Sequence, residues 1–119
     1  MDFIANVANF SVDDSALTVA FADDREDPQD YVILSVAAQE SEQDRKLGLE
    51  GVYLELCAEG RGGYKLIESI ITENNKVQIQ LDPSLAKKND LPLEILITVK
   101  PAITTEVYAG ISEIVRRLR

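Results

Sequence analysis

The chain of 119 residues contains no histidine, no tryptophan and a single cysteine, Cys57. Without histidine it lacks the commonest general base, the commonest metal ligand and every Ser–His or Cys–His nucleophile pair. One cysteine can form neither an internal disulfide nor a CxxC site. Carboxylate or lysine catalysis stays formally open, but no motif favours it. We therefore expect a protein that is not an enzyme and that uses neither a cofactor nor a metal ion.

Long apolar runs are also absent. No stretch approaches the ~20 apolar residues that a bilayer span requires, and the start of the chain, Met1-Asp2-Phe3, lacks the basic and apolar regions of a signal peptide. Together with the lone cysteine, these absences predict a cytoplasmic protein. The length predicts a single domain over residues 1–119, and the apolar content of 45% is sufficient for a core.

Acidic residues outnumber basic ones, and the net charge is −9. The excess is uneven, because residues 1–60 carry 14 acids and 3 bases whereas residues 61–119 carry 7 acids and 9 bases. Such a surface repels nucleic acid and anionic membranes and attracts basic proteins. We therefore expect a basic protein partner, with no nucleic acid and no membrane; solubility alone remains the alternative reading of the charge.

The apolar residues recur mainly with a period of two, which predicts strands rather than helices. Residues 31–38 are almost continuously apolar, which is typical of a central strand covered on both faces. Residues 73–76 contain two adjacent asparagines, a sequence suited to a hairpin turn. The strands predicted in this way cover residues 17–21, 31–38, 52–57, 65–72, 77–81 and 93–99.

Two helices are expected. Asp82 followed by Pro83 favours the start of a short helix over residues 83–89. Apolar residues recur at helical spacing from Val107 to Leu118, and Thr104 or Thr105 can cap that segment. The fold class that follows is α+β: a mainly antiparallel sheet of six or seven strands with the C-terminal helix packed on one face.

Three polar segments could suggest a chemical site. The acidic residues 23–30 lack the spacing and the glycine of a calcium loop, and residues 60–63 match no phosphate-binding motif, so both are predicted to be loops between strands. Glu40, Glu42 and Asp44 resemble the paired acids of a glycosidase only in composition. On an acidic loop without aromatic platforms, surface charge is the favoured reading.

The segment of residues 39–56 has a more specific pattern. After an apolar strand it contains Glu42-Gln43-Asp44, then Leu47-Gly48, then a strand that holds Tyr53 and Glu55. This order, followed by a glycine-rich turn before Tyr64, resembles the bacterial immunity protein 10 family over residues 30–118. Glycines precede Tyr64 here, whereas the family places glycine after the tyrosine, and the first thirty residues show no match.

The resemblance implies an immunity protein of a polymorphic toxin system, which binds a cognate toxin and blocks it. Because the chain is acidic, a cationic nuclease is the toxin that we expect. The residues expected to face the toxin are Glu40, Glu42, Gln43, Asp44, Tyr53 and Glu55.

Two alternatives stay open. Gln43 and Asp44 can instead bond to the backbone of their own loop, and the strand face that holds Tyr53 and Glu55 can be either half-exposed or covered by a helix. The chain can also be a non-enzymatic interaction module, for example a homodimer formed through a sheet edge or a helix face.

Overall fold

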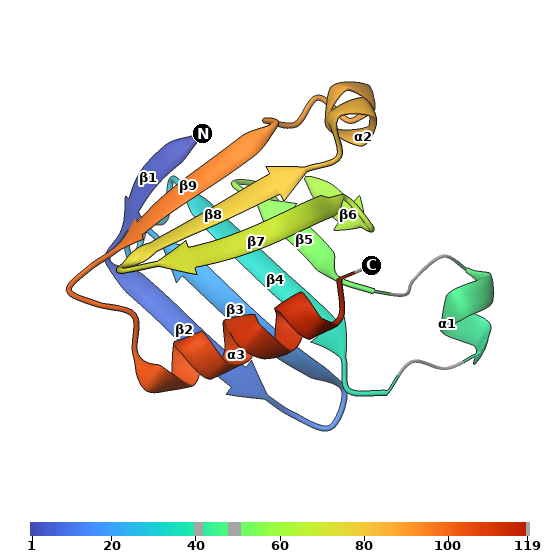
Figure 1. Cartoon of the computed structure of the whole chain (residues 1–119), viewed down its shortest axis with the longest axis horizontal. Helices are drawn as coiled ribbons and strands as arrows, with labels where there is room; N and C mark the ends of the chain where they lie inside the picture. Colours follow the sequence, from blue (N-terminus) through green and yellow to red (C-terminus); the bar gives the residue numbers. More distant parts are fainter. Residues whose placement is uncertain (40–41, 48–50, 119) are drawn as a thin grey trace.

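The computed structural model of the chain describes residues 1–39, 42–47 and 51–118. Within them the strands form two sheets (Figure 1). The five-stranded sheet contains β2 (Val7–Val12), β3 (Ala16–Ala22), β4 (Tyr31–Ala37), β5 (Tyr53–Leu56) and β6 (Gly62–Tyr64). The four-stranded sheet contains β1 (Asp2–Ala5), β7 (Ile67–Glu73), β8 (Lys76–Leu81) and β9 (Glu94–Val99). The helices are α1 (Glu42–Lys46), α2 (Pro83–Lys88) and α3 (Thr105–Arg116).

The two sheets are connected at two places, where a strand of one sheet leads directly into a strand of the other. The strand orders are β2-β3-β4-β5-β6 and β1-β9-β8-β7. All pairs are antiparallel except β1 with β9. Asn6 alone separates β1 from β2, and residues 65–66 separate β6 from β7, so the sheets are joined at two corners.

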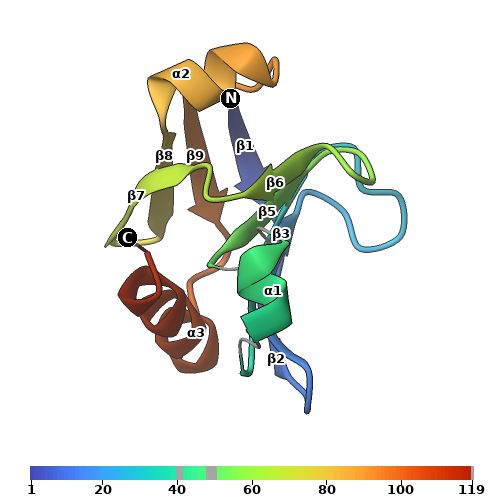
Figure 2. The ribbon, with the colours of Figure 1, turned by 90° about the vertical axis from the view of Figure 1, so that its right-hand side faces the viewer.

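The core lies between the two sheets and α3. Figure 2 shows α3 and the four-stranded sheet on the same side of the five-stranded sheet. Alternate residues of β1, β3, β4, β5, β8 and β9 point into this space, as the period-two pattern predicts. The largest fully buried side chains are Phe21, Leu34, Leu54, Leu56, Ile79, Leu81, Ile95, Ile97 and Ile114.

The long helix α3 begins where the side chain of Thr104 accepts a hydrogen bond from the N–H of Val107 (3.2 Å). It packs closely on the five-stranded sheet, because a Cβ added to Gly110 would lie 2.4 Å from Cδ1 of Phe10. Past its C-terminal end, Arg117 donates to the carbonyl oxygen of Ala37 at the end of β4 (3.2 Å). Among the described residues, no helix is long and apolar enough to cross a bilayer.

The predicted α+β class is confirmed, as are both predicted helices and the hairpin that joins β7 to β8. The cap of α2 is the predicted Asp82, whose Oδ1 accepts from the N–H groups of Ser84 and Leu85. The strands differ from the expectation of one sheet with six or seven members. The described residues form nine strands in two sheets, because β1, β2 and β6 also pair.

The expectation that residues 31–38 are covered on both faces is wrong. β4 is the middle strand of its sheet, but only its inward residues Val32, Leu34 and Val36 are buried. Tyr31, Ile33 and the other outward residues are partly exposed. A continuous apolar run does not distinguish a strand covered on both sides from one whose second face is apolar and open.

Candidate partner-binding surface

The outer face of the five-stranded sheet is the side that points away from α3 and the four-stranded sheet. Its middle contains Ile33 of β4 and the small side chains of Thr18, Ala20 and Ser35 on β3 and β4. The hydroxyl oxygens of Thr18 and Ser35 lie 3.3 Å apart and form a cross-strand hydrogen bond. These residues are partly exposed, so the face is accessible to solvent and to a partner.

Next to the middle of this face lie four residues that we call the tyrosine–glutamate cluster: Tyr31, Tyr53, Glu55 and Tyr64. The Tyr31 hydroxyl donates to Oε2 of Glu55 and the Tyr53 hydroxyl donates to Oε1, both at 3.0 Å. Tyr53 and Tyr64 are directly opposite each other on β5 and β6, with ring centroids 5.2 Å apart and ring planes tilted by 54°. The cluster thus combines three of the four tyrosines of the chain with one carboxylate.

Strand pairing and one tight turn assemble the cluster. The antiparallel register places Glu55 opposite Ile33 and therefore diagonal to Tyr31. The turn after β5 passes through left-handed backbone angles at Cys57 (φ 62°) and Gly60 (φ 78°). It brings the N–H of Gly60 to 3.1 Å from Oε1 of Glu55, so that a third donor holds the carboxylate.

These bonds shift the titration of the cluster. Burial raises the pKa of Glu55, but the bonds from the Gly60 N–H and from the hydroxyls of Tyr53 and Tyr31 outweigh it, and the net pKa is below the usual value. For Tyr31, burial and then the bond to Glu55 raise the pKa to about 12. Burial and the same carboxylate also raise the pKa of Tyr53. Near neutral pH the tyrosines are therefore protonated donors and Glu55 is a charged acceptor.

We predict that Glu55→Gln lowers the pH at which Tyr31 ionises. A tyrosine pKa raised on folding stabilises the fold below its unfolded value near pH 10, and that contribution is lost as the pH rises toward about 12. The lowered pKa of Glu55 acts at the other end, where stability falls as acid protonates the folded carboxylate. Phenolate absorbance measures the alkaline step. The late step, the ionisation of Tyr31, should keep its midpoint in Tyr108→Phe, which removes a tyrosine outside the cluster. Because burial also raises this pKa, the midpoint in Glu55→Gln should fall without reaching the ordinary value, and an unchanged midpoint would contradict the assignment.

Negative charge gathers near one end of this face. The loop of residues 23–30 between β3 and β4 contains five acids, and its residues 24–29 are exposed, as predicted for a solvated loop. The loop is closed by a backbone bond from Asp23 to Asp30 (3.0 Å) and by the bond from the Gln29 N–H to the Asp23 carboxylate (3.0 Å). No group of three or more metal-ligating side chains occurs in the described part of the chain.

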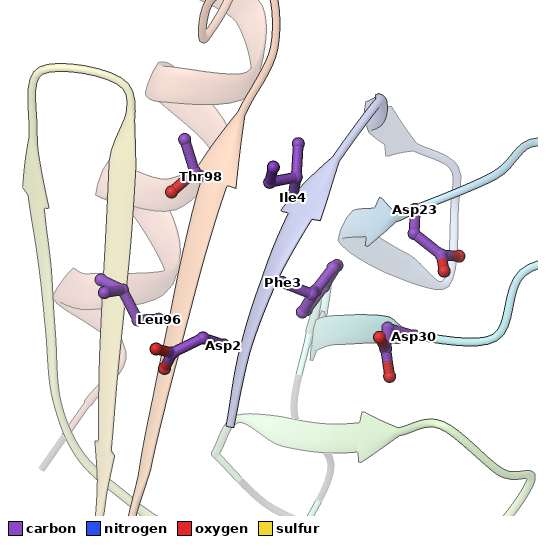
Figure 3. A pocket seen from close by; sticks show the side chains of 7 residues that line it. All are labelled: Asp2, Phe3, Ile4, Asp23, Asp30, Leu96 and Thr98. Atoms are coloured by element: carbon purple, nitrogen blue, oxygen red, sulfur yellow. The ribbon is translucent and has the colours of Figure 1, made fainter.

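An open depression separates this loop from the edge of the four-stranded sheet. Figure 3 shows its lining, with Asp23 and Asp30 on the loop side and Asp2, Ile4 and Leu96 on the sheet side. The acidic surface of the loop therefore continues to the edge of the four-stranded sheet, because the carboxylates of Asp2, Asp23 and Asp30 all border this depression. Carboxylates gathered in this way favour the approach of a positively charged surface.

A comparison with protein families decides the class of the chain. The model of the family described as immunity protein 10 matches residues 4–113. The chain belongs to the immunity protein 10 family. The match begins in β1 and ends in α3, so it spans both sheets. It includes residues 4–30, a region for which the sequence pattern alone shows no match. No curated protein matches the chain. Family membership implies an immunity protein that acts against a toxin.

The structure separates the predicted toxin-facing residues of the immunity protein into two groups. Tyr53 and Glu55 lie together on the partly exposed outer face, which decides between the two faces left open for them. Glu42 and Gln43 are exposed on α1, which projects beyond the end of the sheet (Figure 1). The backbone of Asp44 lies on the same helix, its side chain is not among the described groups, and Glu40 lies outside the described residues.

Sequence reasoning missed three members of this site: Tyr31, Tyr64 and the N–H of Gly60. Each becomes visible only when β4, β5 and β6 are placed in register. One signal was available, because Tyr31 begins a predicted strand, Tyr53 lies near the start of another and Tyr64 directly precedes a third. Tyrosine gathered on one face is typical of a binding surface.

Proposed function

We propose that the immunity protein neutralises its toxin by binding it through the outer face of the five-stranded sheet and blocking it. The observation that carries this proposal is the tyrosine–glutamate cluster. It presents three aromatic rings and one charged carboxylate on a rigid, partly exposed sheet. Tyrosine is enriched at the energetic centres of protein interfaces, and a surface that is already ordered loses little entropy on binding.

The charge around the cluster supports a basic toxin. The five acids of residues 23–30 lie beyond the N-terminal end of β4, and Glu59 is close enough to act on the pKa of both Tyr31 and Tyr53. Carboxylates in this arrangement can occupy the cationic surface with which a nuclease holds phosphates. A cationic nuclease is therefore the class of toxin that we propose.

The helix α1 supplies a second contact in this proposal. It follows β4, whereas the acidic loop of residues 23–30 precedes that strand, so the two lie at opposite ends of a seven-residue strand of roughly 23 Å. An interface of ordinary size buries about 800 Å² on each partner and can reach both ends. We propose Glu40, Glu42, Gln43 and Asp44 as the partner-facing residues at this end.

Co-expression with the toxin encoded beside the immunity protein tests the function. Growth should recover, and the two proteins should purify as a complex. Titration of purified toxin should show complete inhibition at about one immunity protein per toxin, because a blocker acts stoichiometrically. Recovery without a complex, or inhibition by far less than one equivalent, would contradict blocking by binding and would favour a catalytic mechanism.

We predict that removing acidic charge near the interface slows association. Two triple variants compare the two ends: Glu40→Gln with Glu42→Gln and Asp44→Asn, and Asp24→Asn with Glu26→Gln and Asp27→Asn. Each should lower the association rate at low salt by up to about tenfold and weaken its salt dependence, because steering depends on local charge. The matched control neutralises Glu68, Glu73 and Glu106 on β7 and α3. Association rates that are equal in all three variants would rule out steering by these segments.

A further inference from the structure

We infer that Glu55 and the hydroxyl oxygens of Tyr31 and Tyr53 form a receptor for one guanidinium group, the head of an arginine side chain on the toxin. This inference rests on the proposed function, because it names the chemistry that the same surface recognises. The acceptors, the charge and the aromatic rings of the cluster each support it separately.

The acceptors match a group that only donates. A carboxylate has about four positions for donors, and three are filled, two on Oε1 by Tyr53 and Gly60 and one on Oε2 by Tyr31. Oε2 therefore keeps a position. Because each tyrosine directs its proton at Glu55, each phenol oxygen can only accept from an outside group. A guanidinium has five N–H donors and no acceptor, so three neighbouring acceptor oxygens suit it.

The charge of the cluster is not balanced from within. All three donors to Glu55 are neutral, and no cationic group is among the described influences on its pKa. Glu59 adds a second negative charge nearby, since it helps to raise the pKa of Tyr31 and Tyr53. Among the described groups no cation neutralises this partly buried carboxylate, and an incoming cation would stabilise it.

The aromatic rings favour arginine over lysine. Tyr53 and Tyr64 stand side by side with ring centroids 5.2 Å apart, next to the carboxylate that Tyr53 contacts. A planar guanidinium can stack on such a ring while its edge donates to Glu55. A lysine ammonium is a compact, strongly hydrated charge that gains less from a ring face. The strand register and the Gly60 N–H hold these groups in place before binding.

The test is an NMR titration of the labelled full chain with Nα-acetylarginine amide and, separately, with Nα-acetyllysine amide. The two probes carry the same charge. The arginine probe should produce saturable shifts at the Glu55 carboxyl carbon and at the rings of Tyr31, Tyr53 and Tyr64. Its binding should be on the order of fivefold tighter than that of the lysine probe. Glu55→Gln should remove the shifts, whereas Tyr108→Phe on α3 should keep them.

Shifts that do not saturate, that persist in Glu55→Gln, or that are equal for the two probes would overturn the receptor. If Glu55→Gln does not fold, Tyr53→Phe serves instead, because it keeps the carboxylate and removes one acceptor oxygen. Weaker arginine binding is then expected, and unchanged binding would overturn the inference. Arginine binding by a chain whose toxin protection survives Glu55→Gln would sink the proposed interface but keep the receptor. If Glu55→Gln loses protection but the unmodified chain binds no arginine probe, the proposed interface would stand and the receptor would be overturned.

Discussion

Replacing Glu55 with lysine should abolish protection against the toxin. The substitution removes the acceptor that orients Tyr31 and Tyr53 and places a positive charge where we propose that a basic toxin binds. We expect toxin binding to weaken at least about 100-fold, which corresponds to roughly 3 kcal/mol, the range of interface hot spots. Calorimetry on the purified pair measures the affinity, and survival of the co-expressing host measures the consequence.

The matched control is Glu68→Lys, which makes the same change of charge on β7 in the other sheet. Glu68 is exposed and lies away from the outer face of the five-stranded sheet. The Glu68→Lys variant should keep its protection against the toxin and nearly the original affinity. Equal losses in the two variants would show that net charge, rather than the tyrosine–glutamate cluster, governs binding. Full affinity in a folded Glu55→Lys chain would show that the toxin binds elsewhere.

Gly62→Ala should destabilise the fold more than any other single methyl addition to the glycine-rich turn. A Cβ at Gly62 would lie 1.8 Å from the carbonyl oxygen of Leu54 and 2.8 Å from its carbon, and backbone atoms within a sheet cannot move aside. Its φ of 149° is also unfavourable for a residue with a side chain. We expect a loss of about 3 to 5 kcal/mol in the free energy of unfolding, measured in urea. Separation of β6 from β5 would also move Tyr64 away from Tyr53.

Gly60→Ala is the matched control two residues earlier. A Cβ there meets no atom within 4 Å, although the φ of 78° is left-handed. Only backbone strain opposes the change, so the expected loss is about 1 kcal/mol. The N–H that holds Glu55 is retained. Similar losses at the two positions would mean that contact with Leu54 does not decide the requirement for glycine.

Local features of the fold were predictable because their causes are local. Asp82 caps α2 through its own side chain, and Asn74 adopts a φ of 55° in the turn between β7 and β8, as the paired asparagines predict. Alternating leucines place β5 correctly for the same reason. These patterns depend on neighbours within a few residues.

The missed strands depend on distant partners. β1 has four residues and pairs in parallel with β9, more than ninety residues further along the chain, so its own sequence gives little indication of the sheet. β6 contains two glycines and is typical of a loop, yet the close approach of Gly62 to Leu54 makes it a strand. The division into two sheets depends on how β1 and β6 pair, and it could not be derived from the periodicity of the sequence.

The candidate site was predictable only in part. Tyr53 and Glu55 lie within the segment that resembles the family, and the structure places them side by side. Tyr31 and Tyr64 join them across strand pairs, which no contiguous segment displays. The acidic stretch after β4 dominates the sequence prediction because its charges lie within a few residues of one another, whereas the cluster is assembled from three strands.

The four tyrosines allow one direct measurement of the central claim that the toxin covers the outer face of the five-stranded sheet. Tyr31, Tyr53 and Tyr64 lie in the cluster, and Tyr108 is 47% exposed on α3. Hydroxyl-radical footprinting of the immunity protein, alone and in the toxin complex, reports the accessibility of each ring. The account predicts that toxin protects the three cluster tyrosines and leaves Tyr108 as reactive as before. Protection of Tyr108 with no change in the other three would contradict it.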